Sequence, residues 1–230
     1  MLFRSHAQIK PTNVDTRILR AAGTANDTLA GSWIAYGKTQ GETRYSPLKQ
    51  IDTTNVSRLG LAWTYEVGAG GSNQEGTPLM WNNTLYGITT WSVVYALDAR
   101  TGERIWRWDP EINQPAVRPK ICCGIVNRGI ALYNGMIIAP LNDGRMVALN
   151  ALTGKPVWET RVAYPQDLFT LTMAPRIAGD KVIIGASGGD RPTRGFFAAF
   201  DAQTGRFAWK FYTVPGDPSD RKSTRLNSSH

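Results

Sequence analysis

The sequence predicts an all-β protein built as part of a β-propeller, and three observations support this. No long stretch shows the 3.6-residue apolar period of an amphipathic helix. The 230 residues include 23 glycines and 13 prolines, which indicates many turns. One eleven-residue pattern recurs three times without gaps. A repeat of about 50 residues with about four strands is typical of propeller blades.

The recurring pattern is A-x-[DN]-A-x-T-G-x-x-x-W, so each unit has a tryptophan at a fixed position. The copies occupy residues 96–106, 148–158 and 199–209, and their tryptophans are 52 and 51 residues apart. A fourth, degenerate copy ends at Trp63. A large flat indole can pack against the neighbouring blade. A β-sandwich with tryptophans in its core is the alternative, and three ungapped matches argue against it.

Each unit is expected to form a strand, a tight turn and a second strand. The Asp or Asn of the pattern can accept a hydrogen bond from the backbone two residues on, and its glycine tolerates a positive φ. Residues 95–97 are the strand before the first turn. Further upstream and downstream, residues 136–139 and 146–149 flank a hairpin signal at 142–144, and residues 181–185 form another strand.

Both ends of the chain differ in composition and patterning from the rest. Residues 220–230 are polar, lack alternation and look like the translation of a sequencing-adapter oligonucleotide, and residues 1–5 resemble the same adapter in the opposite orientation. A natural basic tail is the alternative. We exclude both ends from the fold and expect residues 6–219 to be a partial propeller of about four blades. A closed ring needs more blades, so the chain is interpreted as an N-terminal fragment, and it carries no information about a signal peptide.

The charge pattern argues against nucleic-acid binding. The chain has 26 Lys and Arg against 18 Asp and Glu, a formal net charge of +8. The basic residues are scattered, and no basic stripe interleaves with aromatic residues as nucleic-acid binding requires. No apolar run approaches the ~18 residues that would span a membrane.

Cys122 and Cys123 are the only cysteines, and they are adjacent. Their spacing fits no zinc site, no C-x-x-C redox pair and no haem attachment motif. Two buried thiols are one interpretation. A disulfide between neighbours is the other, and it would be a strained, special feature.

Together with the repeats, two further segments carry a family resemblance. Residues 33–51 contain Trp-Ile-Ala-Tyr-Gly followed by Thr-Arg-Tyr-Ser-Pro-Leu, and residues 122–129 read Cys-Cys-Gly-Ile-Val-Asn-Arg-Gly. Over residues 13–219 the chain resembles the quinoprotein alcohol and methanol dehydrogenases, which depend on pyrroloquinoline quinone (PQQ). The resemblance implies an eight-bladed propeller with tryptophan-docking motifs, of which this chain holds about four blades, with PQQ and a metal ion on the central axis.

The resemblance also assigns cofactor contacts. Cys122 and Cys123 match a disulfide that lies on one face of the quinone ring. Arg128 matches an arginine beside the quinone oxygens, where a fixed cation stabilises developing charge. Glu75 matches a glutamate at the cofactor's edge, although by itself it would be read as a solvated loop carboxylate. Thr172 matches a hydroxyl that bonds the cofactor.

A loop of small residues is the last matching segment. Ser187, Gly188 and Gly189 match a loop that passes close to the quinone carboxylates, where absent side chains permit close approach. Asp190 falls where calcium-type members have glutamate. Aspartate still offers the hard oxygen ligands that Ca²⁺ or a lanthanide prefers, but it is one methylene shorter. A loop-capping carboxylate is the alternative role for Asp190.

The activity implied is oxidation of an alcohol to an aldehyde by hydride transfer to metal-bound PQQ. The general base is expected beyond the fragment, so no catalytic residue is named, and the isolated fragment is expected to be inactive. The resemblance further implies a periplasmic protein, a small alcohol substrate and a c-type cytochrome or another electron acceptor. It is compatible with an oligomeric full-length protein.

Two rival functions are weighed against this one. A non-catalytic propeller scaffold of the outer-membrane assembly type predicts the tryptophan motifs, but it predicts neither the vicinal cysteines nor Glu75 nor the Gly-Gly-Asp loop. A related quinoprotein acting on sugars or polyols shares the propeller but lacks the vicinal cysteines.

Overall fold

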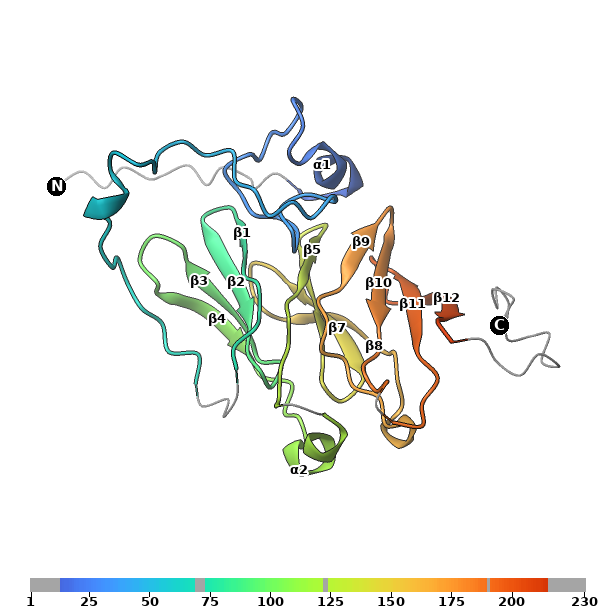
Figure 1. Cartoon of the computed structure of the whole chain (residues 1–230). Helices are drawn as coiled ribbons and strands as arrows, with labels where there is room; N and C mark the ends of the chain where they lie inside the picture. The colour runs from blue at the N-terminus through green and yellow to red at the C-terminus, as the bar shows by residue number, and fades with distance from the viewer. Residues whose placement is uncertain (1–12, 69–72, 122–123, 190, 215–230) are drawn as a thin grey trace.

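Three four-stranded sheets make up the described part of the chain, which comprises residues 13–68, 73–121, 124–189 and 191–214 of the computed structural model (Figure 1). The first sheet holds β1 (Leu79–Trp81), β2 (Thr84–Ile88), β3 (Val94–Asp98) and β4 (Arg104–Trp108). The second holds β5 (Ala131–Tyr133), β6 (Met136–Pro140), β7 (Arg145–Asn150) and β8 (Pro156–Arg161). The third holds β9 (Arg176–Ala178), β10 (Lys181–Gly185), β11 (Phe196–Asp201) and β12 (Phe207–Tyr212). Strands pair antiparallel in chain order within each sheet, which confirms the predicted partial propeller.

Each regular repeat covers the turn between the last two strands of one sheet and part of both strands. The strands expected at 95–97, 136–139, 146–149 and 181–185 are confirmed as β3, β6, β7 and β10. The hairpin signal joins β6 to β7, and its glycine, Gly144, has a φ of 88°. Around the degenerate copy the structure shows a 3-10 turn, η1 (Val56–Arg58), and no strand between residues 52 and 68.

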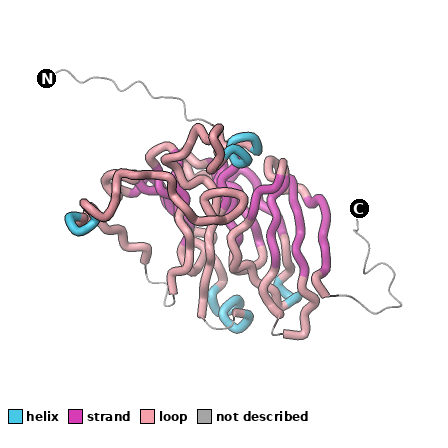
Figure 2. The backbone as a smooth tube through the Cα atoms, turned by 45° about the horizontal axis from the view of Figure 1, so that its top comes forward, coloured by secondary structure: helices cyan, strands magenta, loops and turns pink. Residues whose placement is uncertain are grey.

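Short helices occupy the connections between and before the sheets. They are α1 (Thr16–Ala21), α2 (Gln114–Val117) and the 3-10 turns η2 (Arg118–Lys120) and η3 (Pro165–Asp167). Helix α1 begins after Asp15, whose Oδ1 accepts a hydrogen bond from the Ile18 amide at 2.9 Å. Residues 13–58, mostly loop in Figure 2, lie across one end of the sheets, and α2 lies at the opposite end (Figure 1).

The middle sheet lies at the centre of the hydrophobic core. Every residue of β6 is buried, and so are four of the six residues of β7. One continuous cluster of buried side chains includes residues from all three sheets. By contrast, the last strand of this sheet, β8, buries only Trp158 and exposes most of its other residues. The two neighbouring sheets therefore cover the faces of the middle one, as stacked blades do.

The turn chemistry predicted for the repeats is confirmed in all three. The side chains of Asp98, Asn150 and Asp201 accept a hydrogen bond from the amide two residues on, at 2.8, 3.0 and 3.1 Å. The glycine of each turn has a φ between 70° and 74°. Because the repeat fixes both residues, one local sequence closes the same turn three times.

The repeat tryptophans dock on these turns in the next sheet. The Trp63 indole N–H donates to the Ala99 carbonyl at 3.2 Å, and the Trp106 indole N–H donates to the Ala151 carbonyl at 2.9 Å. The Trp158 indole N–H is buried without a hydrogen-bond partner among the described residues. Trp63 therefore has the docking role of a full repeat although its segment forms no described strand.

Glycine is required where each indole lands. A Cβ built on Gly102 would lie 2.6 Å from the ring of Trp63, and one built on Gly205 would lie 2.6 Å from the ring of Trp158. Gly154 has the same relation to Trp106, at 2.7 Å. The repeated pattern therefore specifies both the turn and the surface against which the tryptophan of the preceding repeat packs.

The turn carboxylates make the free energy of unfolding depend on pH in the acidic range. Hydrogen bonds from Arg100 lower the pKa of Asp98 from 3.8 to about 2. The unfolded chain therefore binds a proton more readily than the folded chain, so this contribution to stability is present above pH 4 and is lost as the pH falls toward 2. We expect Asp98→Asn to flatten the fall in the free energy of unfolding between pH 4 and pH 2. Asn150→Asp, which gives the middle turn the residue of its neighbours, should steepen that fall. Urea denaturation at several pH values measures both, and identical profiles for all three proteins would contradict the prediction.

Candidate cofactor-binding site

Four of the residues assigned to cofactor binding lie in one continuous polar network. Glu75 Oε2 lies 3.2 Å from Arg128 Nη2, forming an ion pair. Arg128 Nη1 donates to Thr172 Oγ1 at 3.1 Å. The hydroxyls of Thr172 and Ser187 are 2.5 Å apart and share a hydrogen bond. The structure therefore brings together side chains that are far apart in the sequence and come from segments next to the strands of all three sheets.

The backbone places these residues side by side at the sheet ends. Glu75, Arg128 and Thr172 each lie three or four residues before the first strand of a sheet. The Arg128 amide donates to the Thr172 carbonyl at 2.9 Å, and the Thr77 amide donates to the Arg128 carbonyl at 3.1 Å. Ser187 follows β10 and pairs with Thr170 through two backbone hydrogen bonds. The three chain segments thus form a short ladder that runs from blade to blade.

The network remains open to a ligand. The side chain of Arg128 is 44% exposed and that of Glu75 is 37% exposed. Because the Arg128 guanidinium has five N–H donors and spends only some of them on Glu75 and Thr172, its exposed part can also donate to an anionic group. The Thr172–Ser187 hydrogen bond uses one of the two hydroxyl protons, so the pair keeps one proton to donate to a ligand oxygen. This combination suits an anionic molecule with several oxygen atoms.

The two glycines of the small-residue loop have different surroundings. Gly188 has a φ of 149°, and a Cβ built on it would lie 3.1 Å from Phe169. A Cβ built on Gly189 would meet no atom within 4 Å, so the chain there borders open space. Cys122, Cys123 and Asp190 lie outside the described residues, so the predicted disulfide and metal ligand stay predictions.

Three buried polar residues behind the network were not predicted to have a role. Ser92, Asn127 and Asn142 have no exposed surface and are joined to one another by hydrogen bonds. In the sequence, Asn127 precedes Arg128 within the Cys-Cys motif, and Asn142 begins the hairpin signal at 142–144. The sequence signal that could have identified them is a polar residue directly next to apolar ones: each of the three adjoins at least one apolar residue.

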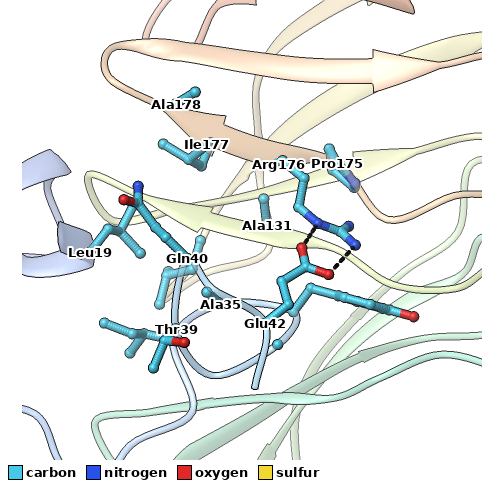
Figure 3. A pocket seen from close by; sticks show the side chains of 14 residues that line it. Leu19, Ala35, Thr39, Gln40, Glu42, Ala131, Pro175, Arg176, Ile177 and Ala178 are labelled. Carbon is cyan, nitrogen blue, oxygen red and sulfur yellow. Dashed lines mark hydrogen bonds and ion pairs between the residues drawn. The ribbon is translucent and has the colours of Figure 1, made fainter. Parts of the chain in front are cut away.

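A separate cavity of about 310 Å³ lies between the N-terminal segment and the first strands β5 and β9 (Figure 3). It contains none of the predicted residues. Its walls are mostly apolar, and its charged groups, Glu42 and Arg176, form an ion pair with each other. The guanidinium of Arg176 also lies over the ring of Tyr36, 4.0 Å from its centroid. These charges serve to hold the N-terminal segment on β9.

Metal and membrane sites were also considered for the described residues. No group of three His, Cys, Asp or Glu side chains within residues 13–68, 73–121, 124–189 and 191–214 is placed to hold a metal ion. The helices of the same ranges are too short or too polar to cross a bilayer.

Known proteins with the same arrangement identify the family. The model of the PQQ family, described as the glucose/ethanol/alcohol dehydrogenase β-propeller domain, matches residues 33–229. Quinohemoprotein alcohol dehydrogenase ADH IIB of Pseudomonas putida is 44% identical over 199 residues, which cover 86% of this chain and 29% of that protein. The dehydrogenase subunit of the quinone alcohol dehydrogenase of Gluconobacter oxydans is 45% identical over 192 residues, covering 80% of this chain and 25% of the relative.

Solved structures agree with the sequence matches. Quinohemoprotein alcohol dehydrogenase ADHIIG of Pseudomonas putida superposes with a TM-score of 0.85 at 43% identity, over 91% of this chain and 30% of that one. A europium-containing methanol dehydrogenase gives a TM-score of 0.78 at 39% identity, over 84% and 34%. The chain thus spans about 30% of the length of these relatives. It belongs to the family of PQQ-dependent alcohol dehydrogenases and contains part of their β-propeller domain.

Proposed function

We propose that this chain is the PQQ-binding part of a periplasmic quinoprotein that oxidises alcohols to aldehydes by hydride transfer to metal-bound PQQ. The names of the relatives support an alcohol as the substrate. One relative, from Thauera butanivorans, is a 1-butanol dehydrogenase (cytochrome c) and is 40% identical to this chain. That name supports a c-type cytochrome as the electron acceptor.

The polar network of Glu75, Arg128, Thr172 and Ser187 is the observation that carries this proposal. PQQ is an anionic quinone with carboxylate groups, and an anion of that kind needs a fixed cation and several hydrogen-bond donors. Arg128 supplies the cation and further N–H donors, and the hydroxyl pair of Thr172 and Ser187 supplies one more donor. The residues that the structure describes therefore fit the cofactor.

Bound PQQ supplies the two-electron acceptor for the alcohol's hydride. The contribution of this chain is to bind and orient. The guanidinium of Arg128 is held by Glu75 on one side and Thr172 on the other, so it is already in place to stabilise negative charge on a quinone oxygen. A preorganised cation of this kind costs no rearrangement during the reaction.

Asp190 is proposed as a metal ligand, and either Ca²⁺ or a lanthanide suits its carboxylate. The europium-containing relative supports the second choice.

Cofactor titration of the full-length gene product tests this function. We expect PQQ with Ca²⁺ or La³⁺ to quench tryptophan fluorescence with a 1:1 end point, and the loaded protein to reduce an artificial acceptor when a primary alcohol is added. Circular dichroism establishes that the protein is folded. A folded protein that binds no PQQ with either metal would contradict the proposal, and release of the protein by osmotic shock tests its location.

A further inference from the structure

A buried polar cluster of Ser92, Asn127 and Asn142 lies directly behind the Arg128 segment. Ser92 is in the loop between β2 and β3, Asn127 precedes β5, and Asn142 is in the loop between β6 and β7. None of the three has exposed surface. Burying polar groups costs free energy unless each is hydrogen-bonded, so the bonds of this cluster are a strong constraint on the local structure.

Hydrogen bonds fix the orientation of the Asn142 amide. The Ser92 hydroxyl donates to Asn142 Oδ1 at 2.8 Å and accepts from the backbone amide of Asn142 at 3.1 Å. Asn127 Nδ2 also reaches the Ser92 hydroxyl, at 3.2 Å. Since its oxygen is held by Ser92, the nitrogen of the Asn142 side chain must point the other way.

That nitrogen joins two segments that carry the site. Asn142 Nδ2 donates to the Val126 carbonyl at 3.0 Å and to the Leu171 carbonyl at 3.5 Å. Val126 lies two residues before Arg128, and Leu171 lies immediately before Thr172. One side chain thus ties together the two backbones that present the guanidinium and its hydroxyl partner.

Only an amide satisfies all these partners. Asparagine offers one acceptor oxygen and two N–H donors, and here the oxygen has one hydroxyl and the nitrogen two carbonyls. Aspartate has the same shape but cannot donate to the carbonyls when ionised. Asparagine is therefore required at position 142 for its hydrogen-bonding groups as well as for its shape. Its bonds reach the backbone segments of the site as well as the core.

We propose that Asn142 is a positioning residue that holds Arg128 and Thr172 at the spacing an anionic cofactor needs. This inference rests on the proposed function, because it takes PQQ as the anion. Asn142 touches no ligand atom itself and acts through Arg128.

The test uses Asn142→Asp in the full-length protein, with Asn150→Asp as the matched control. Asn150 ends β7, the strand that follows the Asn142 loop, and the two other repeats have aspartate at the equivalent position. Asn142→Asp removes the 3.0 Å bond to Val126 and the longer 3.5 Å bond to Leu171. We expect it to weaken PQQ binding about tenfold and to shift the absorption maximum of bound PQQ. The control should leave both unchanged.

A double-mutant cycle separates positioning from general loss of structure. In an Arg128→Ala background, Asn142→Asp should weaken PQQ binding less than twofold, because Asn142 sets the spacing between Arg128 and Thr172 and one of the two is gone. An equal loss in both backgrounds, or no loss in the parent, overturns the proposal. If Asn142→Asp does not fold, Ser92→Ala replaces it in the cycle, with an expected threefold loss that also vanishes without Arg128. Absence of PQQ binding in the unmutated protein would instead refute the proposed function.

Discussion

Replacing Gly154 with alanine should lower the free energy of unfolding by about 3 kcal/mol. Two costs combine at this position. The φ of Gly154 is 70°, which residues with a Cβ adopt only at a cost, and the added Cβ would lie 2.7 Å from the Trp106 ring. The indole cannot retreat without losing its 2.9 Å hydrogen bond to Ala151. Urea denaturation followed by tryptophan fluorescence measures the change.

Gly135→Ala is the matched control for this variant. Gly135 has nearly the same φ, 73°, but a Cβ there would meet no atom within 4 Å. Its substitution should therefore show the backbone cost alone, about 1 kcal/mol. The difference between the two losses in the free energy of unfolding is the steric cost of placing a Cβ against the docked indole of Trp106. Equal losses for both would mean that the tryptophan contact does not constrain the turn.

Loss of Arg128 is expected to have the largest effect on the cofactor. Arg128→Ala should weaken PQQ binding about a hundredfold, because a charge-assisted hydrogen bond contributes up to about 3 kcal/mol. The substitution also frees the Glu75 carboxylate, which would then face the anionic cofactor without its counter-charge. Arg128→Lys keeps the charge but loses the planar fork, so its effect should be intermediate. Fluorescence titration with PQQ measures all three proteins.

Arg107→Ala controls for the removal of a half-exposed arginine. Arg107 is 40% exposed and pairs with Asp109 at 3.0 Å, much as Arg128 pairs with Glu75. It lies on β4, outside the polar network, and its loss should leave PQQ affinity within twofold of the parent. If the two alanine variants bound PQQ equally well, Arg128 would have no special role in binding.

The repeats could be predicted from the sequence because their chemistry is local. Asp98 and Gly102 close a turn whose partners lie within four residues, so a short pattern contains the whole explanation. The same locality accounts for β6, β7 and β10, each an apolar run next to turn residues. Glu75, Arg128, Thr172 and Ser187 could be assigned from the family resemblance, and the structure adds that they contact one another.

The remaining features depend on contacts between distant segments. Ser92 and Asn142 are 50 residues apart, and Glu42 and Arg176 are 134 residues apart. No local pattern distinguishes a hairpin asparagine that is exposed from one that spans three segments in the core. Likewise, the degenerate repeat identifies Trp63 as the counterpart of the repeat tryptophans. Its hydrogen bond to Ala99 becomes evident only once the first sheet is in place.

The docking contacts set the order in which the blades can be completed during synthesis. Each indole rests on a turn that comes later in the chain, 36 residues later for Trp63 and 45 residues later for Trp106. A ribosome that has just added Trp106 must therefore synthesise most of another repeat before Ala151 exists to receive it. During that interval the newest blade has an indole without its acceptor. Each blade is thus completed by its successor, so a slow or damaged repeat leaves the repeat before it unfinished.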